Sequence, residues 1–108
     1  MTREDELDRL QVEMYQNPQS GSFVRLAELY LGKEMATEAV SLIQQSLKFH
    51  PNSVSGLILL GRSLRKMKDY KQALQPLIQA TTLAPDNWRA WLDLAEVYLE
   101  MKVAKKAH

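Results

Sequence analysis

Cysteine is absent from the 108-residue chain. Its absence excludes disulfide bonds, thiolate metal sites, iron–sulfur clusters and cysteine nucleophiles. Histidine is scarce as well, since only His50 and His108 occur, and neither belongs to a spacing typical of metal ligands. No glycine-rich phosphate loop or nucleophile elbow is present. We therefore expect no catalytic residue, no metal site and no cofactor, and a chain that is not an enzyme.

An excess of charge of one sign is also missing, because 14 Lys and Arg residues are balanced by 13 Asp and Glu residues. A nearly neutral chain has no general attraction to nucleic acid, which is therefore disfavoured as a partner. The longest apolar run, Leu57 to Leu60, is far shorter than the ~20 residues that cross a bilayer. The first ten residues are acidic and lack the apolar segment of a signal peptide. We expect no membrane insertion and a cytoplasmic protein.

What the sequence does contain is an internal repeat with a period of 34 residues. Pro51 and Pro85 are separated by this period, and residues of similar size recur in register with them. The columns that occur three times are Phe23, Leu57 and Trp91; Leu26, Leu60 and Leu94; Ala27, Gly61 and Ala95; Tyr30, Leu64 and Tyr98; and Ala39, Ala73 and Ala107. Two further columns, Ile43 with Leu77 and Ser46 with Ala80, occur twice.

Each repeat contains two helical patterns. Phe23, Leu26 and Tyr30 have the i, i+3, i+7 spacing of an amphipathic helix, and a second apolar stripe begins at Ala39. The small residues of the Ala27 column let the two helices approach closely. Proline ends each unit because it cannot continue a helix. The sequence therefore predicts pairs of packed helices.

Polar residues indicate where these helices begin. The predicted N-cap residues are Ser20, Ser53 and Asn87 before the first helices, and Asp69 before the second helix of the second unit. Pro76 is discordant because it falls inside a predicted helix. We place it on the face opposite Ala73 and Leu77, and expect a mild outward kink. His50 stands before Pro51, and we expect it to be exposed or packed within a loop.

These columns resemble the tetratricopeptide repeat (TPR), a 34-residue helix–turn–helix unit. The family pattern runs in the order aromatic residue, Leu-Gly/Ala, Tyr, Ala, aromatic or aliphatic residue, Ala and Pro. The first unit matches it with Phe23, Leu26-Ala27, Tyr30, Ala39, Ile43, Ser46 and Pro51. The second unit matches it with Leu57, Leu60-Gly61, Leu64, Ala73, Leu77, Ala80 and Pro85. The resemblance covers about residues 20–108. It implies an all-α fold, a right-handed α-solenoid of stacked antiparallel helix pairs.

On this basis we divide the chain into an N-terminal capping helix (1–18), repeat 1 (20–53), repeat 2 (54–87) and an incomplete repeat 3 (88–108). Thr2 and Asp5 form a capping-box pattern at the start of the first helix. Glu6 and Glu13 occupy the positions of small residues in the repeats, so we expect that face of the helix to meet water.

The third repeat lacks half of its second helix, which would cover Trp91, Leu94 and Tyr98. An open apolar face of this kind is unusual in a stable monomer. We therefore expect the chain to be a segment of a longer array or, alternatively, to self-associate as a homo-oligomer through its C-terminal end.

In TPR arrays the first helices line a concave groove that binds an extended peptide or a partner helix, and the resemblance implies such a groove here. By register its residues are Gly21, Val24, Glu28 and Leu31; Ser55, Ile58, Arg62, Arg65 and Lys66; and Arg89, Leu92, Glu96, Leu99 and Glu100. The column of Val24, Ile58 and Leu92 either fills the seams between helices or offers shallow pockets to apolar side chains of a ligand. Arg62, Arg65 and Lys66 form either a solvated helix end or a site for the ligand's carboxylates.

The resemblance therefore implies a protein–protein interaction module, a scaffold or adaptor whose protein or peptide partner has apolar anchors and some acidic character. The alternative is a chaperone or an assembly or secretion factor that holds a client. One TPR subtype grips the C-terminal carboxylate of chaperone tails with a lysine–asparagine clamp. The corresponding residues here are Val24, Glu28 and Leu59, so a receptor for chaperone tails is disfavoured. We expect Asp93 and Glu96, spaced i, i+3, to form a solvated face.

Overall fold

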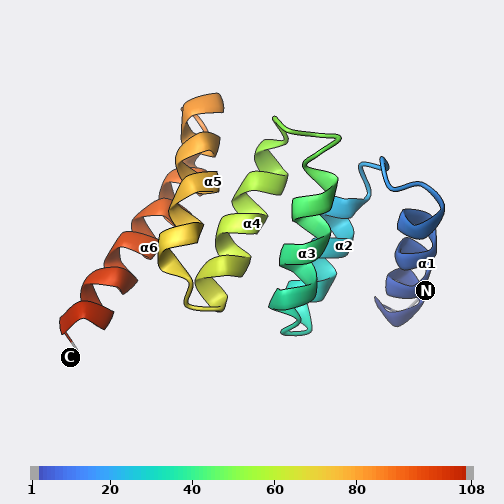
Figure 1. Cartoon of the computed structure of the whole chain (residues 1–108), viewed down its shortest axis with the longest axis horizontal. Helices are drawn as coiled ribbons and strands as arrows, with labels where there is room; N and C mark the ends of the chain where they lie inside the picture. The colour runs from blue at the N-terminus through green and yellow to red at the C-terminus, as the bar shows by residue number, and fades with distance from the viewer. Residues whose placement is uncertain (1–2, 107–108) are drawn as a thin grey trace.

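The computed structural model describes residues 3–106 and, for side chains, residues 5–106. Six helices and no strand occur in this part of the chain. The helices are α1 (Arg3–Gln16), α2 (Phe23–Gly32), α3 (Ala36–Ser46), α4 (Val54–Lys66), α5 (Tyr70–Leu83) and α6 (Trp88–Lys106). They follow one another along an elongated molecule of 44 × 28 × 21 Å (Figure 1). The predicted all-α fold is confirmed.

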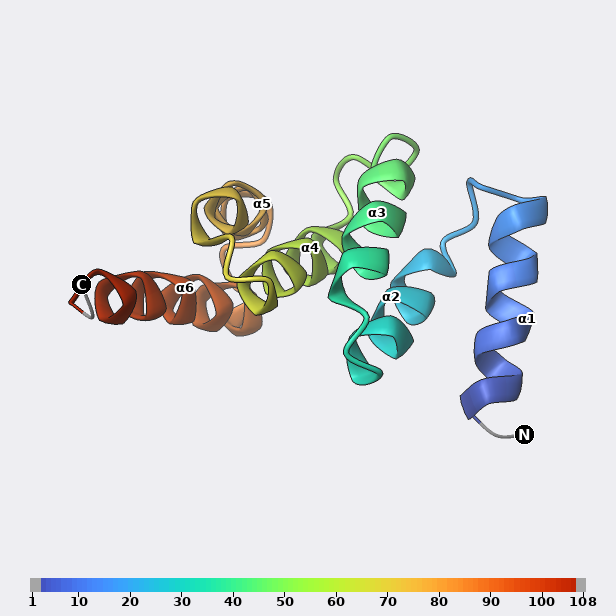
Figure 2. The same ribbon diagram turned by 60° about the horizontal axis from the view of Figure 1, so that its bottom comes forward.

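Helices α2 and α3 form one antiparallel pair, and α4 and α5 form the next (Figure 1). Figure 2 shows α2, α4 and α6 in one row, and α3 and α5 in a second row above it. Helix α4 lies in the middle and contacts both pairs of neighbours, α2 and α6 in its own row and α3 and α5 in the other. The first helices of the three repeats, α2, α4 and α6, therefore lie along one face of the molecule.

The close approach predicted within each pair occurs at the small residues. Ala27 and Ala39 are fully buried between α2 and α3. In the next pair a Cβ atom on Gly61 would lie 2.3 Å from Cγ of Leu77, a separation that side chains cannot adopt. Glycine at position 61 thus allows α5 to lie directly against α4.

Three of the four predicted N-caps are confirmed. Oγ of Ser53 accepts from the amide of Gly56, and Asp69 and Asn87 cap α5 and α6 with their side-chain oxygens. The prediction for Ser20 is wrong, because α2 begins at Phe23. Ser20 instead accepts the backbone N–H of Ser22 within the preceding loop.

The prediction for Pro76 is also wrong. Pro76 is buried, like Ala73 and Ala80, and α5 continues through it. Residues three and four apart share a helix face, which places Pro76 on the same side as Ala73 and Ala80. Pro76 therefore packs inward, on the same face as the residues that it was predicted to oppose. The loop role expected of His50 is confirmed: its ring stacks on Phe23, and its Nε2 lies 2.6 Å from the carbonyl oxygen of Gln19.

The glutamates of α1 contact protein groups where we expected water. Glu6 forms two 2.9 Å hydrogen bonds with the guanidinium of Arg25 on α2, which raises the pKa of Arg25. Glu13 accepts hydrogen bonds from the hydroxyls of Ser20 (2.5 Å) and Ser22 (2.6 Å). Because α1 packs against α2, these positions are part of a polar interface. The capping box of Thr2 lies outside the described residues.

At the other end, α6 has a partly uncovered face. The side chains of Trp91 and Tyr98 are 49% and 51% exposed, as expected. Leu94 is buried, contrary to expectation, because it joins the core that α4 and α5 form around Leu60 and Leu77. The open face of α6, formed by Trp91 and Tyr98, is therefore smaller than the repeat pattern predicted, because Leu94 is not part of it.

Candidate functional site

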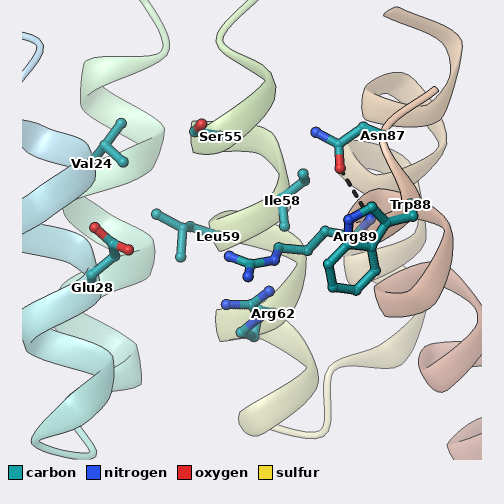
Figure 3. A pocket seen from close by; sticks show the side chains of 9 residues that line it. All are labelled: Val24, Glu28, Ser55, Ile58, Leu59, Arg62, Asn87, Trp88 and Arg89. Carbon is teal, nitrogen blue, oxygen red and sulfur yellow. Dashed lines mark hydrogen bonds between the residues drawn. The ribbon is translucent and has the colours of Figure 1, made fainter. Parts of the chain in front are cut away.

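A cavity of about 300 Å³ opens on the row of first helices. It is lined by Val24 and Glu28 of α2; Ser55, Ile58, Leu59 and Arg62 of α4; and Asn87, Trp88 and Arg89 at the start of α6. In Figure 3 these side chains converge from the three helices on the space between them. We call this set of residues the groove.

Apolar side chains form the floor of the groove. Val24 is half-buried, and Leu59 and Ile58 are buried. Ile58 is only 4% exposed because it packs against Ala80 and Ala90. Of the two roles that the sequence left open for it, filling a seam between helices therefore accounts for most of its surface, although one edge reaches the groove.

Arg62 is held by a carboxylate of its own chain. Its Nη2 donates to Oδ2 of Asp93 on α6 at 2.8 Å, and the Asp93 side chain is only 5% exposed. The prediction that Asp93 belongs to a solvated face is wrong. A buried carboxylate needs such a partner, because leaving it unpaired away from water is costly. Arg62 thus connects α4 to α6 while its side chain lines the groove.

Arg65 forms a second polar connection between the same two helices. Its guanidinium lies 2.9 Å from Glu100 and 3.6 Å from Glu96, and the hydroxyl of Tyr70 also contacts Glu100. The cations predicted to bind a ligand's carboxylates are therefore occupied at Arg65 and partly occupied at Arg62. Their intramolecular partners hold α6 against α4.

Two other charged groups of the groove do not connect helices through ion pairs. Among the described residues, neither Glu28 on α2 nor Arg89 on α6 forms an ion pair, and both are exposed. The guanidinium of Arg89 lies 5.6 Å from the ring centroid of Trp88, a cation–π arrangement. Asn87 orients this segment, since its Oδ1 accepts the backbone N–H of Arg89 at 3.1 Å (Figure 3).

The structure brings only part of the predicted groove set together. Val24, Glu28, Ser55, Ile58, Arg62 and Arg89 line the cavity. The remaining predicted residues that do not line it are Gly21, Leu31, Arg65, Lys66, Leu92, Glu96, Leu99 and Glu100.

Each of these departures has a physical reason. Leu31 is buried and belongs to the main hydrophobic core. Lys66 lies at the end of α4 beside Glu34, in a different cavity. Leu92 and Leu99 are exposed on α6 beyond the groove. Register alone treats all first helices alike, whereas only the first turn of α6 reaches the groove.

Sequence reasoning missed Trp88, which lies at the groove as the first residue of α6. It also missed Asn87 as a lining residue, having assigned it only as a cap. A tryptophan directly after a capping residue could have indicated a groove residue. A large ring at the start of a helix finds little surface on its own helix against which to pack. No group of three or more metal-ligating side chains occurs in residues 5–106, and no helix there has the length and apolarity of a membrane span.

Comparison with known sequences gives the family of the chain. Residues 5–108 match the model of the ChAPs (Chs5p-Arf1p-binding proteins). The chain belongs to the ChAPs family. A curated relative, the uncharacterized protein C31F10.16 of Schizosaccharomyces pombe, is 34% identical over 84 residues, or 78% of this chain. This ChAPs chain spans only 13% of the length of that relative.

Solved structures with the same fold are TPR domains. The first TPR of Spaghetti (RPAP3), bound to the HSP90 peptide SRMEEVD, superposes with a TM-score of 0.86 at 14% identity, covering 93% of this chain and 80% of that one. MamA gives a TM-score of 0.86 at 17% identity, covering 97% and 62%. The TPR2AB domain of yeast Sti1 gives 0.68 at 22%, covering 96% and 41%. The ChAPs chain is thus a right-handed TPR α-solenoid, which confirms the resemblance seen in its sequence.

Proposed function

We propose that the chain is a protein–protein interaction module whose groove binds a peptide or a partner helix. The observation that supports this proposal is the cavity between α2, α4 and α6, where an apolar floor meets unpaired charged groups at the rim. Pockets that bind ligands specifically combine these two kinds of surface. Such a groove suits a scaffold or adaptor, and it would equally hold the client of an assembly or secretion factor.

The family supports the same proposal. ChAPs are named for binding Chs5p and Arf1p. We infer that this chain contributes one protein-binding surface to a longer protein of that kind. The TPR domains of Spaghetti and Sti1 were solved with HSP90 peptides. An HSP90 tail is not the partner we expect here, because Val24, Glu28 and Leu59 replace the clamp residues and Glu28 repels a carboxylate.

Filling the groove tests the proposal. Ser55 is exposed at the groove wall, so Ser55→Trp fills the cavity without entering the core. The matched control is Gln75→Trp, an equally exposed position on α5 away from the groove. We expect Ser55→Trp to weaken binding to purified Chs5p or Arf1p about tenfold or more, and Gln75→Trp to leave it unchanged. Circular dichroism checks that both variants fold, and equal binding by both would refute the groove.

A second candidate function rests on the open face of α6. Trp91 and Tyr98 are half-exposed, whereas their counterparts in the second unit, Leu57 and Leu64, are buried. We infer that this face takes up a further helix, either from a longer protein or from a second copy of the chain. Such a contact would bury apolar surface that water now covers.

A further inference from the structure

We propose that the groove selects a bipolar ligand, a peptide that presents a basic group to Glu28 and an acidic group to Arg89 on either side of an aliphatic side chain. This inference rests on the proposed function and specifies the partner's chemistry. It replaces the acidic partner expected from the sequence, because two of the three cations on which that expectation depended, Arg62 and Arg65, have carboxylate partners of their own, and the third, Lys66, lies in a different cavity.

The charges available to a ligand are set by which groups are already paired. Arg62 is held by the buried Asp93, and Arg65 by Glu96 and Glu100. Within the described residues Glu28 and Arg89 form no ion pair. A ligand that meets these two groups has no ion pair to break, since Glu28 has only a longer-range attraction to Arg25 and Arg89 a cation–π contact with Trp88.

The two groups lie on opposite walls of one cavity. Glu28 belongs to α2 and Arg89 to α6, and both line the groove that α4 floors with Ile58 and Leu59. In Figure 3 the carboxylate of Glu28 lies on the α2 side of Leu59, and the guanidinium of Arg89 reaches over α4, between Leu59 and Ile58 in this view. The order across the groove is therefore negative, apolar and positive. An extended peptide with the complementary order satisfies all three parts.

The positive wall has further features suited to a carboxylate. The N–H of Arg89 is oriented by Asn87, which fixes the first turn of α6. Arg89 also lies over Trp88, so its guanidinium is held over an aromatic face. Arg62, whose Nη2 donates to Asp93, also lines the cavity and adds positive charge on α4. Asp93 acts here as a positioning residue for Arg62.

Blocked peptides provide a defined probe. The bipolar peptide has one glutamate and one lysine on either side of a central leucine, and two analogues replace either charge by glutamine. Amide shifts of the isotope-labelled chain give both the site and the affinity for each peptide. We expect the bipolar peptide to shift Val24 and Ser55, and to bind about threefold more tightly than each analogue, the effect of one exposed ion pair. The difference should shrink in high salt.

Charge reversal then distinguishes a specific role from a structural one. Glu28→Arg should make the groove prefer the analogue that keeps only glutamate, and Arg89→Glu the analogue that keeps only lysine, each by about fivefold. Loss of folding would weaken all peptides together, so a switch in preference cannot come from misfolding. Lys71→Glu, on the exposed surface of α5, is the matched control and should change no preference.

Two results would overturn the inference. If peptides shift the groove amides but show no preference that follows Glu28 and Arg89, the bipolar selectivity is refuted while the groove remains a binding site. If no peptide shifts the groove, although Ser55→Trp still abolishes binding of the protein partner, the peptide occupant is refuted and the proposed function stands. Failure of the proposed function itself appears separately, as partner binding that Ser55→Trp does not change.

Discussion

At the scale of single residues, the most constrained position is Gly61. Its neighbour Leu77 occupies the space that a side chain would need. The fully buried Ala27 has the corresponding place in the first pair, so two units use the same solution for close helix packing. At Ala95 no such constraint applies, since that residue is exposed on the open face of α6.

We predict that Gly61→Ala destabilises the chain by about 1–3 kcal/mol, the usual cost of overpacking a core, although alanine favours helix formation. Urea unfolding followed by circular dichroism measures the change. Gly32→Ala is the matched control, because a Cβ atom there meets nothing within 4 Å. A Gly61→Ala protein as stable as the control would show that α4 and α5 are packed less closely than described.

The buried core was predictable from the sequence, whereas the ion-pair partners were not. Apolar columns predicted the core correctly, because burial repeats with the helix period. The partners of Arg62 and Arg65 were not predictable, since Asp93 and Glu100 lie about thirty residues away on another helix. Charged side chains at equal spacing look alike in a sequence, and only the stacking of α4 on α6 decides which of them meet.

At the scale of elements, α1 differs from the other helices in how it is attached. Its contacts with α2 and the following loop combine an apolar stripe at Leu10 and Met14 with the ion pair of Glu6 and the hydrogen bonds of Glu13. The hydroxyls of Ser20 and Ser22 lower the pKa of Glu13 below its ordinary value of 4.5. Attachment of α1 therefore depends on the ionised form of Glu13.

The stabilisation that Glu13 provides decreases as the pH is lowered. Because the folded-state pKa is lowered, the stabilisation by Glu13 is present above pH 4.5 and is lost as the pH falls through 4.5 and then through the lower folded value. We predict that amide hydrogen exchange in α1 accelerates over this range, relative to exchange in α4. Glu13→Gln should exchange faster at neutral pH and lose that part of the pH dependence. Identical profiles for both proteins would contradict this role for Glu13.

The helix order was predictable from the sequence because each first helix, each second helix and most caps recur with the repeat. The exceptions have local causes. The loop before α2 uses Ser22 to bind Glu13, so the helix begins later than the cap pattern suggested. Pro76 was assigned to the wrong face, although its spacing from Ala73 and Ala80 places all three together.

At the scale of the whole molecule, the described residues form a solenoid with a groove along its first helices and a partly uncovered face on α6. Contacts join each helix only to its near neighbours, as expected of a repeat array. The cavity is lined by Val24 and Glu28 of α2 but only by Trp88 and Arg89 at the start of α6. Register from the sequence places residues on helices but does not show where along each helix a cavity forms, and the exposed Leu92 and Leu99 lie outside the lining of this one.

The open end predicts self-association of the chain when it is purified alone. Sedimentation velocity should show association that increases with concentration, because the half-exposed Trp91 and Tyr98 gain from burial. Replacing both by glutamine should reduce the association without loss of helix content, whereas Tyr15→Gln, at an exposed site on α1, should not. A strict monomer at about millimolar concentration would contradict this role of the face, since weak contacts have dissociation constants of that order.

Site-specific photo-crosslinking tests whether partners bind in the groove. A benzoylphenylalanine residue replaces Ser55 in one protein, Gln75 on α5 in a second, and Tyr98 on the open face in a third. Each protein is irradiated with purified Chs5p or Arf1p. We predict efficient crosslinking from position 55 and little from positions 75 and 98. Crosslinking from position 75 or 98 with none from 55 would contradict it.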